Sequence, residues 1–123
     1  MSRFFIIDDS MFIVTQLTQI LQKGGYQVID YAADGKEAVA RFGELSDSID
    51  VVTLDITLPG MDGVEVLRRI KAIKPEVIVV IVSAIGKQQL VMETRQCGAD
   101  GFIIKPLSKE KVLERVSALC RTV

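Results

Sequence analysis

Five residues able to bind a phosphoryl group directly follow short apolar runs, where a strand of an α/β protein would end. They are three carboxylates, one hydroxyl and one ammonium group: Asp8, Asp9, Asp55, Ser83 and Lys105. In an open α/β sheet, ligands bind outside the carboxyl ends of the strands. If the strands before these residues are near neighbours, all five side chains converge on one crevice.

The charges of this group indicate a cation. Three carboxylates at close range repel one another, and one of them would have to hold a proton unless a cation is present. Mg²⁺ suits a shallow site of this kind, because it keeps several waters and takes only one or two carboxylates. Lys105 adds a second positive charge. Such a set can bind and stabilise a phosphoryl group, and one carboxylate can accept it as an aspartyl phosphate.

Five short runs rich in apolar and β-branched residues predict the strands. They are Phe4–Ile7, Val28–Tyr31, Val51–Leu54, Val77–Val82 and Phe102–Ile104. Several of these runs are apolar at successive positions rather than at alternate ones. This pattern is typical of parallel strands that are buried on both faces.

The stretches between the runs repeat at three and four residues, which predicts helices with one buried face. The apolar stripes are Ile13, Val14, Leu17, Ile20 and Leu21; Ala38, Val39, Phe42 and Leu45; Val64, Leu67, Ile70 and Ile73; Leu90, Val91, Thr94 and Cys97; and Val112, Val116, Leu119 and Val123. Asp34 with Glu37, and Asp62 with Glu65, predict capping boxes, and Ser108 predicts a further N-cap. Five successive strand-helix units favour one parallel sheet with helices on both faces.

Size and composition narrow the class of protein. A chain of 123 residues fits one domain, so residues 1–123 are expected to form a single unit with no attached output domain. The net charge of −1 argues against a nucleic-acid surface. No apolar stretch approaches the ~20 residues of a membrane span, and no signal peptide is evident, so we expect a cytoplasmic protein. The chain has no histidine and therefore cannot itself carry phosphohistidine.

The ordered set of motifs resembles the response-regulator receiver family, and most of all its free-standing chemotaxis members. The motifs are Asp8-Asp9-Ser10, LDITLPGMDG at 54–63, VSAIG at 82–86 and GADGFIIKPL at 98–107. The resemblance covers essentially the whole chain. It implies a flavodoxin-like α/β fold, with a five-stranded parallel sheet in the order 2-1-3-4-5 and five helices on its two faces.

The resemblance also implies a role for each polar residue. Asp55 would be the phosphoacceptor and Asp9 a direct Mg²⁺ ligand, while Asp8 would bind through the metal's waters. Asp55 and the backbone carbonyl of Thr57 would be further metal ligands.

Three further positions follow from the same resemblance. Ser83 and Lys105 would bind oxygens of the phosphoryl group, and the Lys105–Pro106 peptide bond is expected to be cis. Phe102 matches the aromatic switch residue, which turns inward when Ser83 moves toward the phosphate.

The implied function is a signalling switch rather than an enzyme that turns over a substrate. A histidine kinase would supply the phosphoryl group, and the charge on Asp55 would change a surface built from the fourth helix, fifth strand and fifth helix. The residues expected on that surface, or coupled to it, are Leu90, Val91, Arg95, Phe102 and Ile104. The expected process is chemotaxis, with a flagellar motor switch protein as the output partner.

Other interpretations remain open. A phosphorelay intermediate would use the same residues but return its phosphate to a histidine phosphotransfer protein. A phosphohydrolase of the haloacid-dehalogenase type would need Asp-x-Asp after the first strand, where this chain has the adjacent pair Asp8-Asp9. A flavin-binding module would need a Ser/Thr/Gly-rich loop there, which this chain lacks.

Each residue also has a purely structural interpretation. Asp9 or Ser10 could cap the first helix, Ser83 and Lys105 could be ordinary strand-end residues, and Phe102 could belong to the core. Thr57 stands where a known chemotaxis phosphatase of the family uses asparagine, so slow self-hydrolysis or a phosphatase of another type is expected.

Overall fold

A computed structural model describes residues 2–120 and contains one five-stranded parallel sheet. The strands are β1 (Arg3–Ile7), β2 (Gln27–Ala32), β3 (Val51–Leu54), β4 (Ile78–Ser83) and β5 (Gly101–Ile104). Their order is β2-β1-β3-β4-β5, and every pairing between neighbours is parallel. The predicted fold class and strand order are confirmed.

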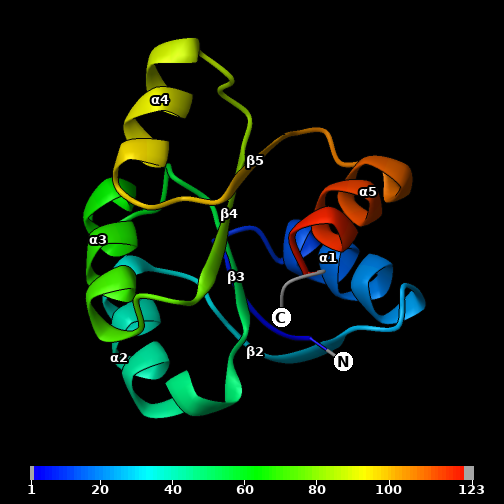
Figure 1. The fold of residues 1–123 in the computed structure, drawn as a ribbon, viewed down its shortest axis with the longest axis horizontal. Coiled ribbons are helices and arrows are strands. Elements are labelled where there is room, and N and C mark those ends of the chain that lie inside the picture. Colours follow the sequence, from blue (N-terminus) through cyan, green and yellow to red (C-terminus); the bar gives the residue numbers. More distant parts are fainter. Residues whose placement is uncertain (1, 121–123) are drawn as a thin grey trace.

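Five α-helices cover the two faces of the sheet (Figure 1). They are α1 (Met11–Lys23), α2 (Gly35–Leu45), α3 (Gly63–Ile73), α4 (Gln88–Gln96) and α5 (Lys109–Cys120). Helices α1 and α5 lie on one face, and α2, α3 and α4 lie on the other. A short 3₁₀ helix (Ser46–Ser48), which the periodicity does not predict, precedes β3.

Two hydrophobic clusters hold these layers together. One lies between the sheet and α2, α3 and α4, and includes Phe5, Phe42 and Leu67; the other lies against α1 and α5 and includes Phe4 and Leu17. Every residue of β3 and β4 is buried, as the continuous apolar runs predict. Each fully buried side chain of this size contributes about 1.5–3 kcal/mol through the hydrophobic effect.

The helix starts agree with the predicted N-caps. Ser10, Asp34 and Ser108 each accept a hydrogen bond from the backbone N–H three residues later. Asp62 caps α3 by accepting from Val64, two residues later. The glutamates of the two predicted capping boxes instead pair with arginines one helical turn ahead.

The last predicted stripe and the two cysteines have different outcomes. Val112 and Val116 are buried against the sheet, as predicted, whereas Val123 lies outside the described residues. Cys97 and Cys120 are half-buried and pack against the two clusters.

Among residues 2–120, no helix is both long enough and apolar enough to cross a membrane.

Ion pairs brace the amino ends of the strands, opposite the polar strand ends. Arg3 of β1 contacts Asp50 before β3 at 3.0 Å. Lys71 of α3 contacts Asp100 at 3.1 Å, and the same carboxylate accepts the backbone N–H of Val79. These contacts join segments 21 to 47 residues apart in the chain, and no local pattern indicates them.

One buried hydroxyl lacks a partner. Thr53, in the middle of β3, is 2% exposed, and within the described residues its Oγ1 makes no hydrogen bond. The buried residues on the neighbouring strands at its register are Ile6 and Val80, which are both apolar. Burying an unpaired hydroxyl is unfavourable.

We predict that Thr53→Val stabilises the protein. Valine has the same shape without the hydroxyl, so the free energy of unfolding should rise by about 1 kcal/mol. Urea denaturation monitored by circular dichroism measures this change. Thr53→Ala is the control, because it removes the hydroxyl but leaves a cavity and should destabilise the protein. A valine variant less stable than the native chain would show that the hydroxyl has a partner.

Candidate functional site

The sheet fixes the backbone of the polar strand ends. The N–H of Asp8 donates to the carbonyl of Ala32 at 3.0 Å, and the N–H of Asp55 donates to that of Ile7 at 2.9 Å. At the far side of the sheet, the N–H of Lys105 donates to the carbonyl of Ser83 at 2.8 Å. Each of these bonds continues the pairing of two neighbouring strands. The site therefore begins from rigid backbone rather than from free loops.

Local turns then orient the two buried carboxylates. Asp8 Oδ1 accepts the backbone N–H of Ser10 at 2.9 Å. Asp55 Oδ1 accepts the backbone N–H of Thr57 at 2.9 Å and the hydroxyl of the same residue at 2.8 Å. An aspartate that binds the N–H two residues ahead forms an Asx turn. The chain therefore turns sharply after β1 and β3, with each carboxylate held on the turn.

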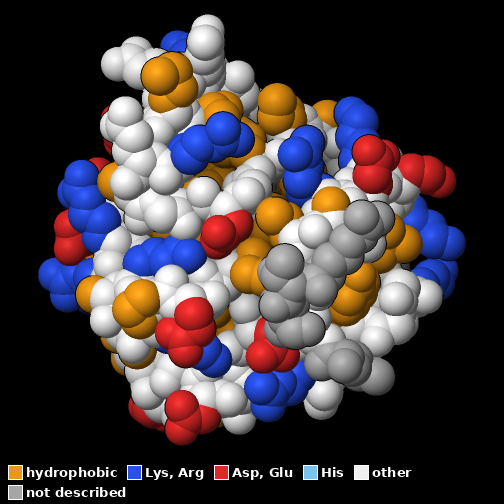
Figure 2. Space-filling view, viewed as in Figure 1, with side chains coloured by type: hydrophobic (Ala, Val, Ile, Leu, Met, Phe, Trp, Pro, Cys, Tyr) orange, Lys and Arg blue, Asp and Glu red, His pale blue; other side chains and the backbone are white. Residues whose placement is uncertain are grey.

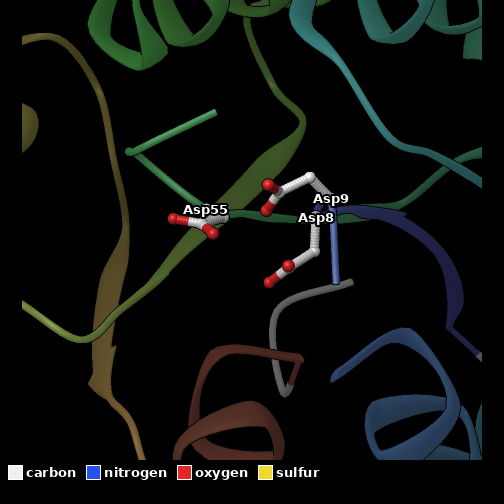
Figure 3. Close-up of side chains that lie close together, drawn as sticks. All are labelled: Asp8, Asp9 and Asp55. Atoms are coloured by element: carbon white, nitrogen blue, oxygen red, sulfur yellow. The ribbon is translucent and has the colours of Figure 1, made fainter. Parts of the chain in front are cut away.

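The three aspartates form one cluster. One carboxylate oxygen from each of Asp8, Asp9 and Asp55 lies within 4.8 Å of the others. Asp8 and Asp55 are 1% and 4% exposed, whereas Asp9 faces solvent. Figure 3 shows Asp8 and Asp9 projecting from the end of β1 beside Asp55 at the end of β3. The structure thus brings together the three carboxylates that the sequence analysis singled out.

Lys105 supplies the nearest positive charge. Its Nζ lies 3.0 Å from Asp8 Oδ2 and 3.3 Å from Asp55 Oδ2. Burial alone would lower the pKa of Lys105, but the hydrogen bonds and charges of the two carboxylates outweigh it and raise the pKa. The ammonium group therefore stays charged and bridges the two carboxylates.

Burial raises the pKa of Asp8, whereas it acts to lower that of Lys105. Loss of water raises the pKa of this carboxyl, and the nearby Asp55 charge adds to the rise. The hydrogen bonds from Ser10 and Lys105 oppose the rise without cancelling it. The site therefore holds more negative charge than one lysine compensates, and a further cation would be favourable.

The donor set fits a hard divalent ion. The groups at the site are carboxylate oxygens, and hard ions such as Mg²⁺ prefer oxygen ligands. Asp9 is exposed and so leaves one side open to water, which Mg²⁺ retains in most protein sites. These residues are consistent with a Mg²⁺ site.

Ser83 and Phe102 are not part of the aspartate cluster. Ser83 is fully buried at the end of β4, and its Oγ accepts the backbone N–H of Ile85 at 3.1 Å. The hydroxyl is thus engaged within its own loop. Phe102 is half-buried in β5 and packs against the cluster beneath α4. The following Lys105–Pro106 peptide bond is cis.

The segment after Asp55 is packed tightly against the first turn of α3. Ile56 and Leu58 are both buried in the cluster beneath α2 and α3. A β-carbon on Gly63 would collide with the backbone carbonyl of Ile56. Glycine at this position therefore permits the close approach that seats the loop carrying Thr57.

A second surface lies over β5. Figure 2 shows hydrophobic side chains gathered between α4 and α5, with basic side chains at their margin. The charged residues that line the grooves on either side of β5 are Arg95, Lys111 and Arg115, with Asp100 and Glu114, and Phe102 and Ile104 are among the apolar ones. Ile104 is 48% exposed. We call this the β5 surface.

Sequence reasoning missed one contact of the site. It assigned Thr57 a role through its backbone carbonyl, whereas the structure shows its hydroxyl on Asp55 Oδ1. An aspartate followed two residues later by threonine is the available signal, because Asx turns have this spacing. That signal predicts the backbone hydrogen bond but leaves the rotamer of the threonine open.

The comparisons with known proteins agree with this geometry. The model of the "Response regulator receiver domain" family matches residues 4–117. The chemotaxis protein CheY of Treponema pallidum is 43% identical over 119 residues, which cover 97% of this chain and 83% of that protein. CheY of Thermotoga maritima is 37% identical over 119 residues, covering 97% of this chain and 98% of that protein.

A solved structure is similar over nearly the same range. It is the CheX-CheY-BeF3-Mg²⁺ complex from Borrelia burgdorferi, with 47% identity and a TM-score of 0.93. The match covers 96% of this chain and 88% of the matched one.

We predict that Asp8→Asn stabilises the metal-free protein at neutral pH. The folded pKa of Asp8 is raised, so stability linked to this group is full at low pH and is lost as pH rises through the folded pKa. The amide removes the cost of burying a charge. The free energy of unfolding, measured by urea denaturation in chelator, should be higher than native at pH 7.

The gain should vanish below about pH 4, where Asp8 is protonated in both states. Asp9→Asn is the matched control, and it should change stability less because Asp9 is exposed. A less stable Asp8→Asn variant at pH 7 would mean that the pairing with Lys105 outweighs burial.

Proposed function

The chain belongs to the response regulator receiver family, and we propose that it is a phosphorylation-controlled binding module with Asp55 as the phosphoacceptor. It is a signalling protein of the CheY kind rather than an enzyme that turns over a substrate. The observation that carries the assignment of Asp55 is its position. It lies at a carboxyl strand end, within 4.8 Å of two other carboxylates and 3.3 Å from the Lys105 ammonium.

The proposed donor is a phosphohistidine on a histidine kinase, as membership of the receiver family implies. Asp55 attacks the phosphorus, and the donor imidazole leaves with the electron pair of the broken P–N bond. Asp9, Asp55 and the carbonyl of Thr57 would hold Mg²⁺, with Asp8 binding through the metal's waters. The ion would neutralise charge on the phosphoryl oxygens. Lys105 can turn from the carboxylates toward one of those oxygens.

The proposed switch is the loop after β4. Ser83 Oγ accepts a hydrogen bond from the N–H of Ile85, and a hydroxyl that accepts one hydrogen bond can still donate another. A phosphoryl group on Asp55 would attract that hydroxyl and draw the loop with it. Helix α4 follows this loop and contributes only Thr94 to the fully buried residues, so it can shift at small cost. Phe102, which packs beneath α4, would turn inward.

The proposed output site is the β5 surface. Apolar Phe102 and Ile104 lie beside three basic side chains and the two acidic ones, Asp100 and Glu114. The basic excess suits a partner with both apolar and acidic groups. Since CheY proteins of several bacteria are 37–43% identical to this chain, we propose that the pathway is chemotaxis. The output partner would then be a flagellar motor switch protein in the cytoplasm. We propose that residues 1–123 act as one receiver domain.

A partner that removes the phosphate is also expected. Thr57 replaces the asparagine with which a known chemotaxis phosphatase of the family works. The similar CheY of Borrelia burgdorferi forms a complex with CheX. We therefore propose a CheX-type protein as the partner that dephosphorylates this chain.

A phosphorelay intermediate is the second candidate function. It would use the same carboxylates and Lys105, because transfer to and from Asp55 follows one path in both directions. Rapid return of the phosphate to a histidine phosphotransfer protein would favour it. No contact of the described residues favours this function over the first.

We predict that incubation with acetyl phosphate adds one phosphoryl group, detected by intact mass. The adduct should require Mg²⁺ and should be absent from Asp55→Asn, which lacks a nucleophilic carboxylate. Asp50→Asn is a matched control, because that carboxylate pairs with Arg3 far from the site. No adduct on the native chain under any condition would contradict phosphorylation by small donors.

We further predict that the phosphorylated chain decays slowly without a partner. The adduct should persist well beyond a few seconds after the donor is removed, as followed by mass or by loss of radiolabel. A half-life of only a few seconds would contradict the need for a dephosphorylating partner. Addition of a CheX-type protein should shorten it.

A further inference from the structure

The two oxygens of Asp55 have different surroundings. Oδ1 accepts two hydrogen bonds, one at 2.9 Å from the N–H of Thr57 and one at 2.8 Å from its hydroxyl. Oδ2 faces Lys105 Nζ at the longer distance of 3.3 Å. The shortest contact on the reactive carboxylate is therefore the hydroxyl of its own turn.

The Thr57 hydroxyl is not required to build this turn. The backbone N–H of Thr57 already closes the Asx turn, and the side chain of Thr57 is exposed. Neighbouring Ile56 and Leu58 are buried and fix the path of the loop. A hydroxyl that is dispensable for the loop but lies 2.8 Å from the nucleophile acts on Asp55 itself.

The energetic effect follows from the change in charge at Asp55. A hydrogen bond to an ionised carboxylate is stronger than one to a neutral carbonyl. On phosphorylation, the carboxylate becomes the neutral acyl part of an anhydride, and its negative charge leaves with the acetate of the donor. The hydroxyl of Thr57 therefore stabilises the free carboxylate more than the phosphorylated one.

We propose that the Thr57 hydroxyl is a positioning residue that holds Asp55 in its unphosphorylated form and slows phosphoryl acceptance. This inference rests on the proposed function. In the reaction with acetyl phosphate, an Asp55 oxygen forms a bond to phosphorus, the O–P bond of the donor breaks, and acetate leaves with the electron pair. No proton is gained or lost. The hydrogen bond from the Thr57 hydroxyl must weaken as Asp55 loses its negative charge and the acetate gains it.

This effect is separate from access of water. The exposed side chain of Thr57 lies two residues after Asp55, so its size could alter hydrolysis after Asp55 has reacted. The hydrogen bond described above acts earlier, on the free carboxylate. Threonine and valine have nearly the same shape, so exchanging them changes the hydrogen bond while leaving access to the phosphorus almost unaltered.

The test compares the native chain with Thr57→Val and Thr57→Ser. The rate of adduct formation with acetyl phosphate is measured by intact mass over a range of Mg²⁺ concentrations, and decay is measured after the donor is removed. Both variants keep the backbone carbonyl at position 57. Thermal denaturation shows that each variant is folded.

Thr57→Val should accept the phosphoryl group roughly three- to tenfold faster than the native chain at saturating Mg²⁺. Thr57→Ser keeps the hydroxyl and should restore the slow rate, which a purely structural role of the side chain would not predict. The decay rates of the native and valine proteins should be similar.

An equal or slower rate for Thr57→Val would overturn the proposal. An increase confined to subsaturating Mg²⁺ would also overturn it, because the effect would then lie in metal binding. A change in decay alone would assign the residue to water access. If the native chain formed no adduct, the prediction that small donors phosphorylate Asp55 would fail together with this inference, whereas an adduct with unchanged rates would overturn the inference alone.

Discussion

Repulsion among carboxylates is the constraint on which this site depends. The parallel sheet places Asp8, Asp9 and Asp55 within 4.8 Å of one another, and two of these residues are almost completely buried. Lys105 compensates part of this charge and keeps its own proton because the carboxylates raise its pKa. The remaining imbalance is the physical reason that the site suits a divalent cation and, with it, a phosphoryl anion.

The rest of the fold makes this unfavourable arrangement stable. Two hydrophobic clusters fix the sheet on both faces, and ladder hydrogen bonds hold the backbones of Asp8, Asp55 and Lys105. Ion pairs at the opposite end, such as Arg3–Asp50, brace the strands far from the carboxylates. The buried charges therefore cannot relax by moving apart. They can change state only by exchanging partners: Lys105, a metal ion or a phosphoryl group.

Helix α4 is weakly packed compared with the central strands. It buries only Thr94 completely, and the loop before it is exposed from Ala84 to Lys87. Ser83 joins this loop to β4, whose residues are all buried. In the function proposed above, a change in charge at Asp55 would meet a tightly packed sheet on one side and this weakly packed helix on the other.

The sequence alone determined the elements and most of the residues of the site. Continuous β-branched runs such as Val51–Leu54 predict buried parallel strands, because both faces of such strands lack water. Polar residues directly after those runs must lie at one edge of a parallel sheet, so Asp8, Asp55 and Lys105 could be grouped from their positions. The strand order itself came from the resemblance to a family, since periodicity does not specify which strands are neighbours.

Only the tertiary structure decided how those residues pair. Lys105 contacts Asp8, 97 residues away, as closely as it approaches Asp55, because strand order and register set that distance. Glu65 pairs with arginines of its own helix instead of closing the predicted capping box, because the spacing of residues does not specify its rotamer. The hydroxyl of Thr57 on Asp55 is a choice of the same kind. Local patterns determine what each segment forms, whereas side-chain partners depend on distances that exist only once the layers have packed.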